Sequence, residues 1–65
     1  MKLIVNGQQH EAASQNLDAL LTELDYAGRL VATALNGDFV PKDERAATPL
    51  ADGDKIEILA PMKGG

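Results

Sequence analysis

The sequence predicts a single α+β domain in which a mixed sheet of four to five strands packs on one main helix. Three observations predict this class: two Asn-Gly pairs that follow apolar segments, four leucines at helical spacing, and a late segment that alternates charged and apolar residues. A chain of 65 residues buries only about 60% of its unfolded surface, so the core is thin. We therefore expect one domain over residues 1–60, followed by a flexible tail at residues 61–65.

The N-terminal segment predicts the first two strands. Residues 2–5 read Lys-Leu-Ile-Val, an apolar and partly β-branched run that favours extended backbone. Asn6-Gly7 follows, and it predicts a tight hairpin because type I′ turns need positive φ at both central positions. Residues 9–12 would form the returning strand, and their polarity predicts a place at the edge of the sheet.

The main helix is predicted from a set of leucines on one face. These leucines recur at i, i+3, i+4 and i+7, and they are Leu17, Leu20, Leu21 and Leu24. Polar residues occupy the opposite face, namely Asp18, Thr22, Glu23 and Asp25. Ser14 and Asn16 are both candidate N-caps, and Asn16 fits the apolar register better. Gly28 is expected to be the left-handed residue that ends the helix.

The second half of the sequence predicts two or three more strands. Residues 31–35 carry no charge, so we expect a strand that is buried on both faces. A second turn at Asn36-Gly37 leads into a short strand at residues 39–40, which Pro41 ends. Residues 42–50 are expected to be irregular, with one helical turn around residues 43–46. A third turn at residues 52–54 precedes the last strand, residues 55–59.

The order of these elements predicts how they assemble. The first and last strands can pair in parallel at the centre of the sheet because a long connection separates them. The helix then covers one face, where its leucines meet Leu3, Val5, Ile56 and Ile58. This is the β-grasp, or ubiquitin-like, arrangement.

Composition excludes several classes of function. The net charge of −4 argues against nucleic acid binding, which needs a basic surface, and favours a partner with a basic docking face. The chain has no cysteine, so we expect no disulfide and no thiolate metal site, and a cytoplasmic location. No apolar stretch approaches the roughly 20 residues of a membrane span, and we expect no membrane partner.

Nothing in the sequence predicts an enzyme active site. His10 and Ser14 occur once each, four residues apart, and no catalytic triad follows from them. Asp52 and Asp54 flank Gly53 but lack the other ligands of a calcium loop, so a tight turn with local hydrogen bonds is expected. We therefore expect no catalytic residue and no metal.

The last two residues carry the most specific signal. Gly64-Gly65 would close a chain by chance in about 0.5% of cases, although tails also favour small residues in general. The five residues from Pro61 to the end can extend roughly 16–18 Å, and two residues without Cβ can pass through a narrow channel. The Gly65 carboxylate can be adenylated and then attacked by an external sulfur, which leaves a thiocarboxylate. Gly65 is thus the predicted site of modification, presented by Gly64 and Gly65.

The whole sequence resembles the ThiS family of sulfur carriers. The resemblance rests on the Met-Lys-Leu-Ile-Val-Asn-Gly start, the leucine-rich helix, residues 31–41, residues 52–58 and the terminal Gly-Gly. It implies that a ThiF-type enzyme uses ATP to adenylate Gly65 and that a persulfide donor supplies the sulfur. It also implies delivery of that sulfur to a ThiG-type thiazole synthase. The chain would be a carrier with no bound cofactor, not an enzyme, and a monomer when free.

Two other functions stay open at this stage. MoaD-type carriers of molybdopterin synthesis share the fold and tail but usually run longer, and a ubiquitin-like interaction module would share the fold alone. For either carrier, partners must bind the folded body, since a short tail offers too little surface. The candidate docking residues are apolar (Phe39, Leu59, Met62) or acidic (Asp54, Glu57, with Asp52 beside them). For Phe39, exposure and a place over the core are equally compatible with the sequence.

Overall fold

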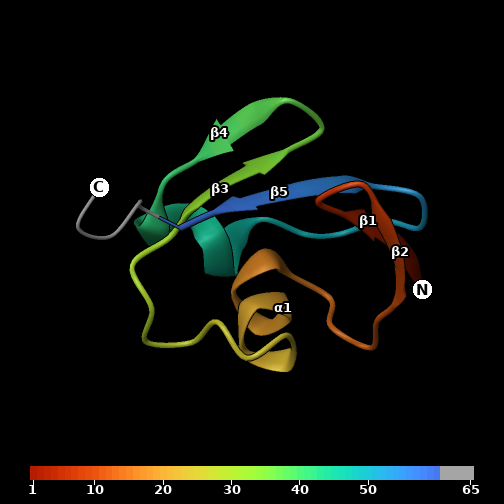
Figure 1. The fold of residues 1–65 in the computed structure, drawn as a ribbon, viewed down its shortest axis with the longest axis horizontal. Helices are drawn as coiled ribbons and strands as arrows, with labels where there is room; N and C mark the ends of the chain where they lie inside the picture. The colour runs from red at the N-terminus through yellow and green to blue at the C-terminus, as the bar shows by residue number, and fades with distance from the viewer. Residues whose placement is uncertain (61–65) are drawn as a thin grey trace.

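A computed structural model, which describes residues 1–60, shows a five-stranded mixed sheet packed against one α-helix (Figure 1). The elements in chain order are β1 (Lys2–Val5), β2 (Gln8–Glu11), α1 (Leu17–Glu23), β3 (Ala32–Leu35), β4 (Asp38–Val40), the 3-10 helix η1 (Lys42–Ala47) and β5 (Lys55–Leu59). The strand order is β2-β1-β5-β3-β4, in which β1 and β5 are parallel and the other neighbours antiparallel. The predicted β-grasp arrangement is confirmed. The expected tail at residues 61–65 lies outside the described residues.

Both Asn-Gly pairs form the tight turns that the sequence predicts. Asn6 and Gly7 have φ of 50° and 81°, and Asn36 and Gly37 have φ of 51° and 89°. This left-handed backbone matches the right-handed twist of the flanking strands in a two-residue hairpin. The first turn leads into β2, which lies at the edge of the sheet as its polar sequence predicts.

Helix α1 begins where the sequence predicts but ends earlier. The Asn16 side-chain oxygen accepts a hydrogen bond from the Ala19 N–H at 2.8 Å, so Asn16 is the N-cap. The left-handed residue after the helix is Asp25, with φ of 68°, and the prediction that Gly28 ends the helix is wrong. The Asp25 and Tyr26 N–H groups donate to the carbonyls of Thr22 and Leu21, which is a Schellman motif. Aspartate tolerates this backbone conformation better than most residues, so no glycine is needed there.

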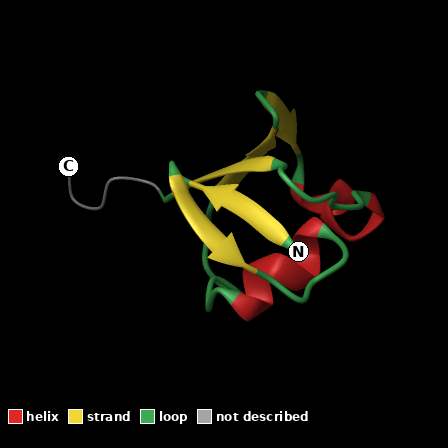
Figure 2. Ribbon diagram, turned by 90° about the vertical axis from the view of Figure 1, so that its right-hand side faces the viewer, coloured by secondary structure: helices red, strands yellow, loops and turns green. Residues whose placement is uncertain are grey.

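The core lies between α1 and one face of the sheet (Figure 2). Leu3, Leu17 and Leu20 are completely buried, and Ile56 is nearly so. The predicted contact between the helix leucines and the inner residues of the first and last strands is confirmed. Leu24 is only partly buried because the helix has already ended at Glu23.

The opposite face of the sheet, which we call the open face, has no helix over it. The prediction that β3 is buried on both sides is therefore wrong. Thr33 points into the core and is 2% exposed, whereas Ala32 is exposed and Ala34 is half-buried on the open face. The prediction took the absence of charged residues as a sign of burial on both faces. Small uncharged residues such as alanine can also lie on an uncovered face.

The 3-10 helix η1 holds a buried arginine that the sequence did not reveal. Arg45 is 7% exposed. Its Nε donates to the Thr33 hydroxyl at 3.0 Å, and its Nη2 donates to the Val31 carbonyl at 2.7 Å. The Thr33 hydroxyl in turn donates to the Val40 carbonyl at 2.8 Å. Since a buried charge needs hydrogen bonds, this chain of contacts ties η1 to β3 and β4.

Glu23 does more than occupy the polar side of α1. Its carboxylate accepts hydrogen bonds from the N–H groups of Ala13 and Ser14, at 3.1 to 3.2 Å, and from the Ser14 hydroxyl. Ser14 therefore contacts the end of the helix rather than capping its start. The Ser14 hydroxyl and then the Ala13 N–H lower the pKa of Glu23 below its usual 4.5.

Replacing Leu20 by Ala tests the core directly. Leu20 is completely buried, so Leu20→Ala should lower the free energy of unfolding by about 2–5 kcal/mol. Thr22→Ala, on the exposed side of the same helix, should change it by no more than about 0.5 kcal/mol. Urea denaturation of both variants provides the measurement. Equal losses would mean that the helix packs in a different register.

Replacing Glu23 by Gln tests the carboxylate contacts through their pH dependence. Because the folded chain lowers the pKa of Glu23, the unfolded chain binds more protons in acid, and the stabilisation is complete only above pH 4.5. Wild type should therefore be more stable than Glu23→Gln at neutral pH, and the difference should shrink as the pH falls through the folded-state pKa. Thermal unfolding between pH 3 and pH 7 measures this, and a pH-independent difference would contradict the assignment.

Candidate functional site

The site predicted from the sequence adjoins the end of β5. Ala60 follows this strand and is the last described residue, so Met62, Gly64 and Gly65 lie outside the part of the chain that the structure describes. The described residues nevertheless define the surface from which the chain continues toward Gly65. That surface consists of the end of β5 and its neighbours in the sheet.

Asn6 holds the end of β5 through its side chain. Its Nδ2 donates to the Ile58 carbonyl at 3.1 Å, and its Oδ1 accepts from the Ile58 N–H at 2.8 Å. The amide thus imitates a peptide group and continues the parallel ladder beyond the point where β1 turns away. Ile58 directly precedes Leu59, so this contact fixes the position at which the chain leaves the sheet.

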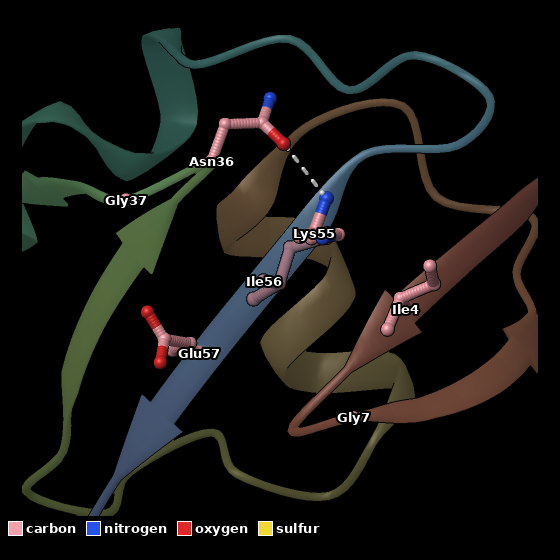
Figure 3. A pocket seen from close by; sticks show the side chains of 7 residues that line it. All are labelled: Ile4, Gly7, Asn36, Gly37, Lys55, Ile56 and Glu57. Carbon is pink, nitrogen blue, oxygen red and sulfur yellow. Dashed lines mark hydrogen bonds between the residues drawn. The ribbon is translucent and has the colours of Figure 1, made fainter.

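Asn36 holds the start of the same strand (Figure 3). Its side-chain Oδ1 accepts a hydrogen bond from the Lys55 backbone N–H at 3.0 Å, and its backbone N–H donates to the Lys55 carbonyl at 2.7 Å. The two Asn-Gly turns therefore both contact the central strand through asparagine. The sequence predicted the turns but not these contacts, because they join positions 52 and 19 residues apart.

Two of the predicted docking residues lie on the open face near the end of β5. Phe39 is 69% exposed and Leu59 is 66% exposed, so Phe39 does not cover the core. Phe39 lies opposite Ala34, and Leu59 lies opposite Ala32. Since two strand spacings of about 4.8 Å separate β4 from β5, the alanines form a low floor between the larger side chains.

A second apolar feature at this end of the sheet was missed by the sequence analysis. Leu30 is 82% exposed, and together with Val31, Ala32, Leu59 and Ala60 it lines a groove of about 370 Å³, which we call the apolar groove. Leu30 falls outside every periodic pattern in the sequence, and an isolated leucine in a loop carries no strong signal. Its position beside Leu59 shows only in the fold.

The acidic candidates lie in different places. Glu57 is exposed on β5, two residues before Leu59 and on the same face. Asp54 lies at the other end of β5, where its carboxylate accepts from Asn36 Nδ2 at 3.1 Å and from the Ala51 N–H at 2.8 Å. Asp52 accepts from the Lys2 N–H at 2.6 Å. Only Glu57 adjoins the apolar residues, and the docking roles of all these residues stay predictions.

A hollow larger than the apolar groove lies at the start of β5, away from Leu59. It measures about 650 Å³ and is lined by Ile4, Gly7, Asn36, Gly37, Lys55, Ile56 and Glu57 (Figure 3). Backbone turns form much of its wall, and Asn36 is already bonded to Lys55. This hollow therefore follows from the two hairpin turns rather than from a set of converging chemical groups.

Residues 1–60 hold no group of side chains arranged for metal binding or for a catalytic triad. In this part of the chain no three His, Cys, Asp or Glu side chains are grouped so that they could hold a metal ion. Within the same residues no hydrogen bond joins His10 to Ser14, whose hydroxyl donates to Glu23. None of the helices formed by these residues is long and apolar enough to cross a membrane.

Comparison with known proteins decides the family. The sequence model of the ThiS family matches residues 3–65. The chain therefore belongs to the ThiS family. The sulfur carrier protein ThiS of Escherichia coli strain K12 is 33% identical to it, and the match covers the full length of both.

Solved structures agree with this membership in the ThiS family. The crystal structure of the thiamine biosynthesis protein ThiS from Geobacter metallireducens matches with a TM-score of 0.84 and 35% identity over all of both chains. A solution structure of a thiamine biosynthesis protein from the same organism matches with a TM-score of 0.81 and 35% identity, over all of this chain and 88% of that one.

One relative of this ThiS-family chain is much longer. A thiazole synthase of Paramagnetospirillum magneticum is 44% identical over the whole of this chain. The chain spans only 20% of the length of that protein.

Replacing Asn6 by Gly tests the contact that fixes the end of β5. Glycine keeps the positive φ of the turn, so the change removes the two hydrogen bonds to Ile58 without straining the backbone. Asn6→Gly should cost about 1–3 kcal/mol of stability and should speed amide exchange at Ile58. Hydrogen exchange followed by NMR measures this. Unchanged exchange at Ile58 would show that the side chain does not hold the strand.

Proposed function

We propose that this chain is a sulfur carrier of thiamine biosynthesis whose working group is the carboxylate of Gly65. The observation that carries the proposal is the match of the ThiS family through residue 65, which brings Gly64-Gly65 within the family pattern. The full-length similarity to the sulfur carrier protein ThiS of Escherichia coli supports the same function.

The proposed chemistry starts with ATP on a ThiF-type enzyme. A carboxylate oxygen of Gly65 attacks the α-phosphate of ATP, pyrophosphate leaves, and an acyl-adenylate forms. The terminal sulfur of a persulfide then attacks the acyl carbon, and AMP leaves. In the resulting acyl disulfide, a second thiol attacks the sulfur that belongs to the donor, not the one bonded to the acyl carbon. This attack forms a new disulfide with the donor and releases the thiocarboxylate. No side chain of the carrier takes part, so the carrier is a co-substrate rather than an enzyme.

The proposed acceptor of the sulfur is a ThiG-type thiazole synthase. The similarity of this chain to one fifth of a thiazole synthase from Paramagnetospirillum magneticum supports this partner. In that relative, a segment similar to this chain is part of the same polypeptide as a protein named thiazole synthase.

The folded body supplies the docking surface in this proposal. A standard interface covers about 800 Å² on each partner, which is more than a five-residue segment can offer. Phe39 and Leu59 are large apolar side chains exposed on the open face, and apolar side chains that gather on one face suit an interaction surface. Because Leu59 directly precedes Ala60, an enzyme that binds the body there could also reach Gly65.

Changing the length of the chain at Gly65 tests the proposed chemistry. Deleting Gly65, or adding one alanine after it, should reduce ATP–pyrophosphate exchange by the ThiF-type enzyme by at least about a thousandfold, because the reacting carboxylate is misplaced. Far-UV circular dichroism should show that both variants stay folded. Full exchange by the extended variant would contradict Gly65 as the site.

Replacing Leu59 by Ala tests the docking surface. The variant should raise the KM of the adenylating enzyme for the carrier about tenfold and leave kcat unchanged, since the anchor makes its contact in the ground state as well as in the transition state. Gln15→Ala, at an exposed position in the loop before α1 and outside the apolar groove, serves as the matched control. An equal KM for Leu59→Ala and wild type would place the docking surface elsewhere.

A further inference from the structure

Three of the six lysines and arginines of the chain line one hollow. This cationic hollow lies between α1, the loop that follows it and η1, and it measures about 400 Å³. Arg29, Lys42 and Arg45 contribute positive charge, and among residues 1–60 Asp18 is the one carboxylate in the lining. The lining thus carries a net charge of +2, although the whole chain carries −4. The hollow is a positive region on an acidic protein.

Arg45 lacks a negative partner within the described residues. Its two hydrogen bonds go to a hydroxyl and a carbonyl, which are uncharged. Among residues 1–60 the ion pair within 4.0 Å joins the N-terminal amine to Glu11. No carboxylate of these residues therefore lies within 4.0 Å of the Arg45 guanidinium. A buried charge without a counter-ion is costly. An anion bound in the hollow would supply that counter-ion.

The other two cations are available to the same anion. The Arg29 guanidinium lies 5.9 Å from the centre of the Tyr26 ring, and this cation–π contact positions it at the hollow. Lys42 is exposed at the first position of η1. Asp43 and Glu44 follow it in the same short helix but are not part of the lining. The positive charges of the lining therefore outnumber its negative charges.

The hollow adjoins the surface that an enzyme acting on Gly65 must approach. Leu30 lines both the cationic hollow and the apolar groove, which ends at Ala60. Five extended residues from Ala60 to Gly65 span at most about 18 Å, so the enzyme must come close to the groove. A footprint of about 800 Å² centred there would extend over Leu30 to the hollow.

We propose that the cationic hollow receives carboxylate side chains of the enzyme that adenylates Gly65. This inference rests on the proposed function and adds a second contact to the apolar one. Apolar residues would provide the area of the interface, and the paired charges would fix the orientation in which the carrier docks. The acidic carrier would then meet a locally acidic part of its partner at this position.

Charge reversal in the hollow tests the proposal. Lys42→Glu and Arg29→Glu change the charge of the full-length chain by the same amount as Lys2→Glu, and Lys2 lies on β1 outside the hollow. The KM for the carrier in ATP–pyrophosphate exchange and the Kd for the same enzyme by calorimetry should rise about tenfold for each hollow variant. The kcat should stay unchanged, and the effect should weaken at high salt.

The control variant separates the possible outcomes. Lys2→Glu should change KM and Kd less than twofold once circular dichroism has shown that all three variants are folded. Equal increases in the three variants would mean that only net charge matters, and no increase in either hollow variant would mean that the hollow is not a contact. Either result overturns the proposal. If wild type supports no exchange at all, the proposed function fails, and the Kd values alone then decide whether the hollow binds the enzyme.

Discussion

The parallel pairing of β1 and β5 at the centre of the sheet is the interaction on which the rest of the structure depends. It joins the first and the last strand of the described chain side by side, and β3 pairs with the other edge of β5. Ile56 and Ile58 both lie on the face of this central strand that α1 covers, and both are buried in the core. Asn6 and Asn36 extend the pairing with side-chain amides where the neighbouring strands turn away.

The size of the chain explains why the sheet has two unlike faces. One short helix can cover one face only, so the hydrophobic residues of the other face remain accessible. In an isolated protein such residues would favour aggregation, whereas in the proposed carrier role they would offer a surface to successive partners. The proposed chemistry fits this division, because it needs a rigid body for recognition and a chain end that reaches another protein's active site.

Local patterns predicted most of the fold. Positive φ at both Asn-Gly pairs and the burial of Leu17, Leu20 and Leu21 follow from turn chemistry and helical spacing, which involve neighbours in the sequence. The end of α1 was misplaced at Gly28, because glycine is the usual left-handed residue and Asp25 a less common one.

Most other features that the sequence did not predict are contacts between distant residues. The burial of Arg45 depends on Val31 and Thr33 lying beside η1, and the exposure of Leu30 beside Leu59 depends on how the helix connects to β3. Neither contact leaves a periodic pattern. For the candidate site, the sequence predicted Phe39, Leu59 and Glu57, which the sheet places on one face, but not Asn6, Leu30 or the cationic hollow.

The most direct test of the account is to locate sulfur on the carrier. Full-length protein would be incubated with ATP, the ThiF-type enzyme, a persulfide donor and a thiol, and then analysed by intact and tandem mass spectrometry. We expect one oxygen of the Gly65 carboxylate to be replaced by sulfur. The sulfur carrier protein ThiS of Escherichia coli with its own enzymes would show that the assay works. An unchanged mass beside a working control, or sulfur at any residue other than Gly65, would contradict the central claim.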